Sequence, residues 1–167
     1  EACERYPEID GRALDFQRFP IYFRFGKEQA GSPHMTDCVR KVREITKRVG
    51  DGRGRPMLLS VRSMARPAQN RALGLDVFAW AAEGLIDFVM VSHYLRNEYP
   101  LPIAEYRPLF PAGMPVYASI EYEGEADRYR EIARELWRAG VDGVSMFNFF
   151  ASREGERKPP FEVLHEI

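Results

Sequence analysis

Short apolar runs that resemble strands alternate with longer amphipathic runs along the chain, and this alternation limits the fold more than any other feature. Strands are predicted at 11–23, 57–62, 85–94, 114–123 and 141–150. Helices are predicted at 37–49 with Thr36 as N-cap, at 67–84, 103–110 and 125–140, and as an opening turn at 159–167. Strands that alternate with helices are typical of a parallel sheet with helices outside it. The pattern therefore excludes all-α and all-β folds.

The composition indicates an ordinary globular domain. At 167 residues, 45% of them hydrophobic, the chain can bury one core, so we expect a single domain over 1–167. A net charge of -1 and the absence of any span-length apolar run disfavour nucleic acid and membranes as partners. Cys3 and Cys38 have neither metal-knuckle spacing nor disulfide-scaffold density. The sequence leaves the compartment open, with secretion or a periplasmic location among the options.

Two parallel architectures fit the alternation, the open doubly wound sheet and the closed (β/α)8 barrel. A dinucleotide fold would place a Gly-rich phosphate loop after its first strand, but "GDGRGRP" precedes a strand and "GKEQAG" lies in a long loop, so neither fits. Polar side chains instead follow the carboxyl ends of several strands, where a barrel builds its site. A whole barrel takes about 250 residues. We therefore expect a partial barrel, strands four to eight, with the first three strands upstream of Glu1.

Alternation within a strand predicts which side chains point into such a barrel, because successive residues face opposite sides of the sheet. The predicted inward set is Ala13, Asp15, Gln17, Ser60, Arg62, Tyr117, Ser119 and Glu121. The strands at 85–94 and 141–150 are apolar on both faces, so alternation leaves open which of their residues face the lumen.

The inward set contains two carboxylates on different strands, Asp15 and Glu121. Glycoside hydrolysis requires at least two carboxyl groups at the same end of the barrel, one as acid and one as nucleophile or base. Their separation, and so the choice between retention and inversion, does not follow from the sequence, and neither does the role of each. The residues predicted to orient the sugar are Arg18, Arg62, His93, Tyr94 and Asn148.

Each of these residues also has a structural interpretation. Asp15 and Arg18 could form an ion pair that closes a strand, and Glu121 could belong to a solvated run of acids. His93 could be a hydrogen-bonded rim residue rather than a base. Since no second His lies at metal-binding spacing, we expect no metal, and no motif predicts another cofactor.

The segment "IDGRALDFQRFP" resembles the strand-four signature of the glycosyl-hydrolase-like barrels, a family of (β/α)8 proteins. That signature runs Asp-Gly, a few residues, and then Phe/Leu-Asp-x-x-Arg-Phe/Tyr-Pro. It is carried here by Asp10, Gly11, Leu14, Asp15, Arg18, Phe19 and Pro20. The order of the later strands is also similar to strands five to eight of such a protein. The resemblance implies a catalytic or substrate-contacting role for Asp15, with Glu121 on the seventh strand as its partner.

The leading expectation is therefore the C-terminal part of a glycoside hydrolase barrel that acts on an oligo- or polysaccharide. One alternative is a non-catalytic carbohydrate-binding or inactive barrel fragment. An open sheet edge in such a fragment would favour self-association. A second alternative is a metal-dependent barrel hydrolase, for which bound metal would be diagnostic.

Overall fold

The protein is described by a computed structural model that covers residues 5–6, 8–94, 98–150 and 158–167. One parallel sheet has five strands in sequential order. The strands are β1 (Gly11–Asp15), β2 (Leu58–Met64), β3 (Phe88–Ser92), β4 (Val116–Ile120) and β5 (Gly143–Met146). The prediction of an α/β protein with a five-stranded parallel sheet is confirmed.

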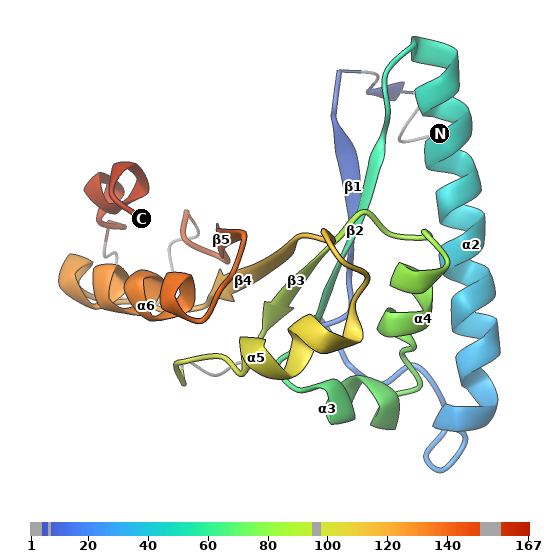
Figure 1. Ribbon diagram of the computed structural model, residues 1–167, viewed down its shortest axis with the longest axis horizontal. Helices are drawn as coiled ribbons and strands as arrows, with labels where there is room; N and C mark the ends of the chain where they lie inside the picture. Colours follow the sequence, from blue (N-terminus) through green and yellow to red (C-terminus); the bar gives the residue numbers. More distant parts are fainter. Residues whose placement is uncertain (1–4, 7, 95–97, 151–157) are drawn as a thin grey trace.

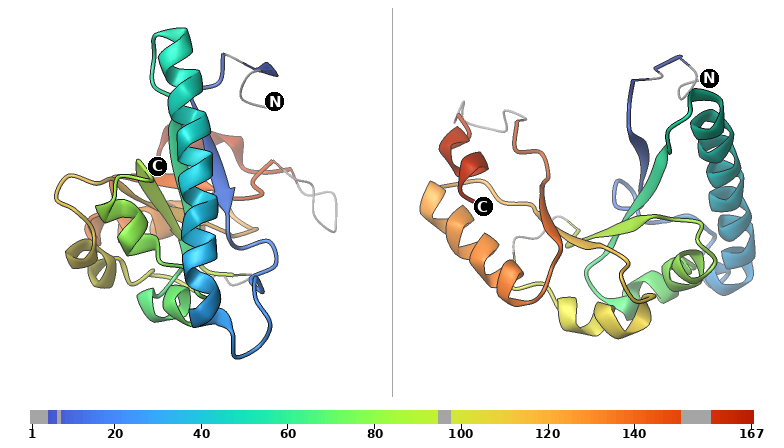
Figure 2. Two further views of the ribbon diagram at one scale, coloured as in Figure 1. Left: turned by 90° about the vertical axis from the view of Figure 1, so that its right-hand side faces the viewer. Right: turned by 45° about the horizontal axis from the view of Figure 1, so that its top comes forward.

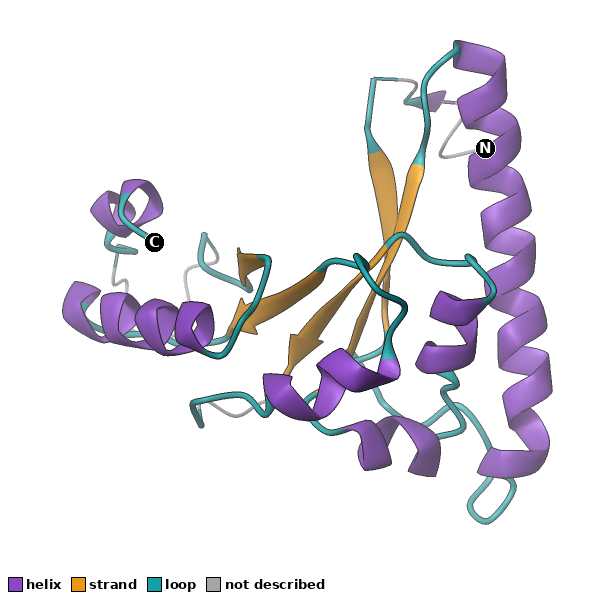
Figure 3. Ribbon diagram, viewed as in Figure 1, coloured by secondary structure: helices purple, strands orange, loops and turns teal. Residues whose placement is uncertain are grey.

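Helical segments connect each strand to the next, and one more follows the last strand. They are α2 (Glu28–Arg53), α3 (Pro67–Ala72), α4 (Val77–Ala82), α5 (Ile103–Tyr106), η1 (Arg107–Leu109), α6 (Ala126–Arg138) and η2 (Phe161–His165). Figures 1 and 3 show α2 running alongside β1 and β2, with α6 beside the other end of the sheet. In Figure 2 (right) the α-helices follow one another along the outer side of a curved sheet.

The outer face of the sheet holds the hydrophobic core. Its strand residues are 1% exposed or less: Leu59, Val61, Val89, Val91, Val116, Ala118 and Ile120. They belong to one apolar cluster with Trp80 of α4, Tyr106 of α5 and Leu136 of α6. Each fully buried Val or Leu contributes about 1.5–3 kcal/mol. Burial of this face therefore fixes which side chains remain for the inner face.

The inner face carries a continuous row of side chains across the sheet. Asp15 lies beside Arg62, Arg62 beside Met90, and Met90 beside Tyr117. Tyr117 in turn lies beside Gly143, where a Cβ would be 2.1 Å from the Tyr117 ring. The prediction that Asp15 and Arg62 share the inner face is thus confirmed, because adjacent residues in register point to the same side.

The amino ends of the strands are held by a recurring aspartate. Asp87, before β3, accepts a hydrogen bond from Leu59 N (2.6 Å) and pairs with Arg43 (2.9 Å). Asp142, before β5, accepts from Val116 N (2.7 Å) and pairs with Arg107 (2.6 Å). The hydrogen bond from Val116, followed by the charge of Arg107, holds the pKa of Asp142 below its usual range. The aspartates at these two strand starts are therefore structural.

The first strand is shorter than the predicted segment 11–23. It ends at Asp15 because the Asp15 carboxylate accepts a hydrogen bond from Gln17 N at 2.8 Å. A carboxylate that binds the backbone two residues on forms an Asx-turn, which competes with strand continuation. The chain therefore leaves the sheet before Arg18.

The predicted helix 103–110 is divided into α5 and η1, and α2 continues to Arg53 instead of ending at residue 49. Three further differences are larger. Helix α2 starts at Glu28, eight residues before Thr36, whose Oγ1 instead accepts from Trp80 Nε1 at 2.8 Å. The predicted helix 67–84 is divided into α3 and α4 at Gly74, which has a φ of +74°. The predicted opening turn at 159–167 is the 3-10 helix η2. In the first two of these three cases tertiary packing or backbone geometry overrides a local propensity.

Among the described residues, no helix combines the length and apolar character needed to cross a membrane. No cluster of three or more His, Cys, Asp or Glu side chains in these ranges could hold a metal ion. Cys38 is exposed, and Cys3 lies outside the described residues.

Gly74, between α3 and α4, provides a test of how closely this turn packs against Glu28 and Phe23. A Cβ there would lie 2.4 Å from Glu28 O and 2.9 Å from the Phe23 ring, whereas at Gly113, with a φ of +80°, it would meet nothing within 4 Å. We expect Gly113→Ala to lower the free energy of unfolding by about 1–2 kcal/mol, the cost of a left-handed backbone conformation for a residue with a Cβ. Gly74→Ala adds a clash of about 1–3 kcal/mol. Denaturant unfolding of both variants measures the difference, and equal free energies of unfolding would refute the close approach.

Candidate functional site

A cavity of about 220 Å³ opens at the carboxyl ends of the strands. It draws side chains from every strand or from the segment that follows it. They are Gln17, Arg18 and Phe19 after β1, Arg62 of β2, Tyr94 after β3, Glu121 after β4, and Phe147 and Asn148 after β5. We call this cavity the Arg62 pocket.

Arg62 is the buried cation of this pocket, with only 5% of the residue exposed. Its Nε donates to Asp15 Oδ1 at 2.9 Å and its Nη2 donates to Asp15 Oδ2 at 3.0 Å. Two parallel bonds between a guanidinium and a carboxylate are strong and fix the orientation of both groups. The Asp15 side chain is 40% exposed, so the pair joins a buried cation to a carboxylate that solvent reaches.

Phe147 covers Arg62 from the last strand. Its ring centroid lies 3.6 Å from the guanidinium carbon, a close cation–π contact. Phe147 therefore faces the inner side of the sheet. The sequence alone does not decide this direction, because the segment 141–150 is apolar on both faces. The contact ties the end of β5 to the centre of β2.

Gln17 connects the loop after β1 to the next two strands by hydrogen bonds. Its Nε2 donates to Ser63 O at 2.5 Å and to Ser92 O at 2.7 Å, and the residue is 1% exposed. These carbonyls lie near the carboxyl ends of β2 and β3. Sequence alternation places Gln17 inward but gives no hint of this role, because the acceptors are backbone atoms of distant segments.

Two buried polar atoms of the pocket side chains have no hydrogen-bond partner among the described residues: Arg62 Nη1, a donor, and Gln17 Oε1, an acceptor. Buried polar groups are normally satisfied, so both mark places for a missing group. A carboxylate or phosphate could serve only Arg62. A hydroxyl group, of water or of an alcohol, both accepts and donates and so suits either atom.

Glu121 is buried in the pocket at 6% exposure, so it does not belong to a solvated acidic run. Its backbone N donates to Tyr99 Oη at 2.7 Å, and Tyr99 Oη donates to Ser119 O at 3.3 Å. Burial raises the pKa of Tyr99 to about 12, so this hydroxyl stays protonated at neutral pH. Tyr99 thus fixes the backbone at the end of β4.

Tyr22 stabilises the loop that follows β1. Its hydroxyl donates to Phe16 O, and its ring meets the Phe16 ring edge-on at 5.6 Å. Burial, and then the charge of Asp15, raise the pKa of Tyr22 to about 12. The phenol therefore remains a hydrogen-bond donor and holds the turn that follows Asp15.

The structure brings most of the predicted site residues to one place. Glu121, Arg18, Arg62, Tyr94 and Asn148 line the Arg62 pocket, and Asp15 is bonded to Arg62 beside it. The partner of Asp15 is Arg62, while Arg18 is exposed with its guanidinium 5.6 Å from the Phe19 ring.

His93 is the predicted residue that lies apart from this set. It lines a neighbouring cavity, which Tyr94 shares with the Arg62 pocket. Its ring meets Tyr99 edge-on at 6.5 Å. The substrate-binding roles predicted for these residues stay predictions.

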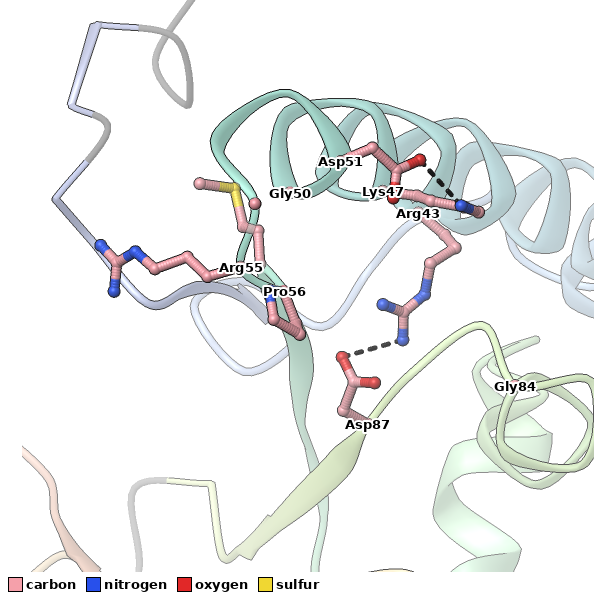
Figure 4. Close-up of a pocket in the computed structure, with 10 residues that line it drawn as sticks. Arg43, Lys47, Gly50, Asp51, Arg55, Pro56, Gly84 and Asp87 are labelled. Carbon is pink, nitrogen blue, oxygen red and sulfur yellow. Dashed lines mark hydrogen bonds and ion pairs between the residues drawn. The ribbon is translucent and has the colours of Figure 1, made fainter.

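A larger cavity, about 650 Å³, lies at the opposite end of the sheet between the end of α2 and the starts of β2 and β3 (Figure 4). Its charged side chains are paired: Arg43 with Asp87, Lys47 with Asp51, and Arg55 with Asp10 outside the cavity. The Arg43–Asp87 pair joins α2 to the start of β3, at the end of the sheet that carries the structural aspartates, and the Lys47–Asp51 pair lies within α2. We therefore place the functional site at the Arg62 pocket.

No model of a protein family matches the chain, and a search of curated proteins finds no match either. The assignment of function below consequently depends on the geometry of the pocket.

The role of Gln17 can be tested by its removal. Gln17→Leu leaves the carbonyls of Ser63 and Ser92 without this donor, at about 1–3 kcal/mol for each buried group. Gln29→Leu is the matched control, since Gln29 is exposed and its Nε2 donates to Arg71 O. We expect Gln17→Leu to lower the free energy of unfolding by at least about 2 kcal/mol more than the control. Similar losses in the two variants would contradict the assigned role.

Proposed function

We propose that this sheet is an arc of a (β/α)8 barrel and that the Arg62 pocket is the active site of a glycoside hydrolase. The sequential strand order, the helices along the outer side and the polar cavity at the carboxyl ends all support the barrel (Figure 2). The proposed substrate is a carbohydrate with at least one ring held in the pocket.

One observation carries the proposal: Glu121 and Arg62, the partner of Asp15, line a pocket that has one unsatisfied donor and one unsatisfied acceptor, each suited to a hydroxyl group. Glu121 lines the pocket, and Asp15 is bonded to Arg62, which also lines it. Arg62 Nη1 and Gln17 Oε1 are one donor and one acceptor that lack partners among the described residues. Sugars present many hydroxyls, and aromatic rings such as Phe147 and Tyr94 suit their apolar faces.

The hydrogen bonds of Asp15 support different roles for the two carboxyl groups. Asp15 accepts two hydrogen bonds from Arg62 and one from Gln17 N, so its orientation is fixed and it is suited to stabilise positive charge at the anomeric carbon. Glu121 then takes the proton-transfer role. Arg62 acts through Asp15 as a positioning residue.

A second candidate is carbohydrate binding without catalysis. Both oxygens of Asp15 are engaged, one by Arg62 Nη2 and the other by Arg62 Nε and Gln17 N. A carboxylate held in this way also serves as a purely structural anchor for the pocket. Such a protein would bind sugars but would not hydrolyse them.

Substitution of the two carboxyl groups tests the catalytic proposal. Asp15→Asn and Glu121→Gln should each lower kcat on aryl glycosides by about 10²–10⁴-fold, the usual contribution of a positioned acid or base. The panel comprises aryl α- and β-glycosides of the common hexoses, pentoses and N-acetylhexosamines. Unfolding midpoints of all variants establish that the loss is not one of folding.

Asp10→Asn and Glu123→Gln are the controls, because Asp10 pairs with Arg55 at the far end of β1 and Glu123 is exposed. Both should turn over substrate at the wild-type rate. Undiminished kcat in Asp15→Asn or Glu121→Gln would refute the role of that residue. Sugar binding by the wild type, with no turnover of any panel member, would select the second candidate.

A further inference from the structure

A second cavity lies next to the Arg62 pocket. It has a volume of about 460 Å³, roughly twice that of its neighbour, and it lies over the carboxyl ends of β2 and β3. Its lining consists of Pro20, Met64, Arg66, Gln69, Ala72, Leu73, His93, Tyr94 and Glu98. We call it the Arg66 pocket.

The two pockets meet at a thin boundary. Tyr94 lines both of them, and the consecutive residues Phe19 and Pro20 line one each. The hydroxyl of Tyr94 contacts Arg18 O across this boundary at 3.4 Å, near the limit for a hydrogen bond. A weak bond between solvent-exposed groups is easily replaced by a ligand. The two pockets therefore adjoin at Tyr94.

The lining of the Arg66 pocket suits a sugar ring. Met64, Leu73 and Pro20 offer apolar surface, while Arg66, Gln69 and Glu98 offer hydrogen-bonding groups. The guanidinium of Arg66 pairs with Glu105 at 3.6 Å, and both side chains are more than half exposed, so the pair gives way to a ligand at little cost. A pyranose has the same mixture, with apolar C–H faces and a hydroxyl rim.

We propose that the Arg66 pocket is a second subsite for the same substrate, so that the protein binds at least two consecutive sugar residues, one on either side of Tyr94. This inference depends on the proposed carbohydrate specificity of the Arg62 pocket. It gives His93 a binding role away from the carboxylate pair, because His93 lines the Arg66 pocket. It also predicts that oligosaccharides bind more tightly than monosaccharides, since a second ring adds contacts.

The test blocks the Arg66 pocket without touching the Arg62 pocket. Ala72 is exposed on α3 and lines the Arg66 pocket, so Ala72→Phe fills it. Ala68→Phe is the matched control, because Ala68 is exposed on the same helix but does not line either pocket. Unfolding midpoints of both variants show that each is folded.

Binding is measured by isothermal titration calorimetry, first with methyl glycosides of the common hexoses and pentoses. The monosaccharide that binds is then compared with its own oligomers of two to six units. For the wild type and Ala68→Phe we expect the dimer or trimer to bind about tenfold or more tightly than the monomer, a gain of about 1.4 kcal/mol. Ala72→Phe should abolish that gain and leave monosaccharide affinity unchanged.

Three results would overturn the inference. Equal wild-type affinity for monomer and oligomers would show that no second ring is bound. Retention of the length dependence in Ala72→Phe would place the second ring elsewhere. Failure of every glycoside and oligomer to bind the wild type would refute the carbohydrate proposal itself, whereas the first two results leave it standing.

Discussion

The ion pair between Arg62 and Asp15 is the interaction on which the rest of this sheet end depends. Arg62, of which only 5% is exposed, requires a partner for its charge, because an isolated charge in that position would cost several kcal/mol. Asp15 meets this requirement only if β1 and β2 pair in the observed register. The same carboxylate ends β1 by binding Gln17 N. One pair thus sets strand register, loop geometry and the charge at the centre of the pocket.

The two ends of the sheet have different roles: side chains at the amino ends stabilise the fold, and those at the carboxyl ends line the candidate site. At the amino ends, Asp87 and Asp142 each bind a backbone N–H of a neighbouring strand and an arginine, so their hydrogen-bonding capacity is used within the fold. At the carboxyl ends, Arg62 and Gln17 each keep a polar atom without a partner among the described residues. Both atoms belong to side chains that line the Arg62 pocket, which is therefore the candidate ligand site.

Much of this arrangement follows from the sequence. The alternation of strands and helices predicts the parallel sheet, and period-two alternation predicts that Asp15 and Arg62 share a face. The role of Gln17 could not be predicted, because its acceptors lie 46 and 75 residues away. Phe147 follows a strand that is apolar on both faces, so only its contact with Arg62 shows that its side chain points to the inner face. The early start of α2 could not be predicted either, because it includes Gly31, a poor helix former, which packs against the Phe23 ring.

Chemical-shift mapping by NMR tests the central claim, that the Arg62 pocket is a carbohydrate site, most directly. On titration with methyl glycosides, the backbone amides of Gln17–Phe19, Arg62, Glu121 and Phe147 should shift in a saturable way. Those of Gly50–Met57, at the opposite end of the sheet, should not. Saturable shifts confined to Gly50–Met57, or none at the Arg62 pocket with any glycoside, would contradict the account.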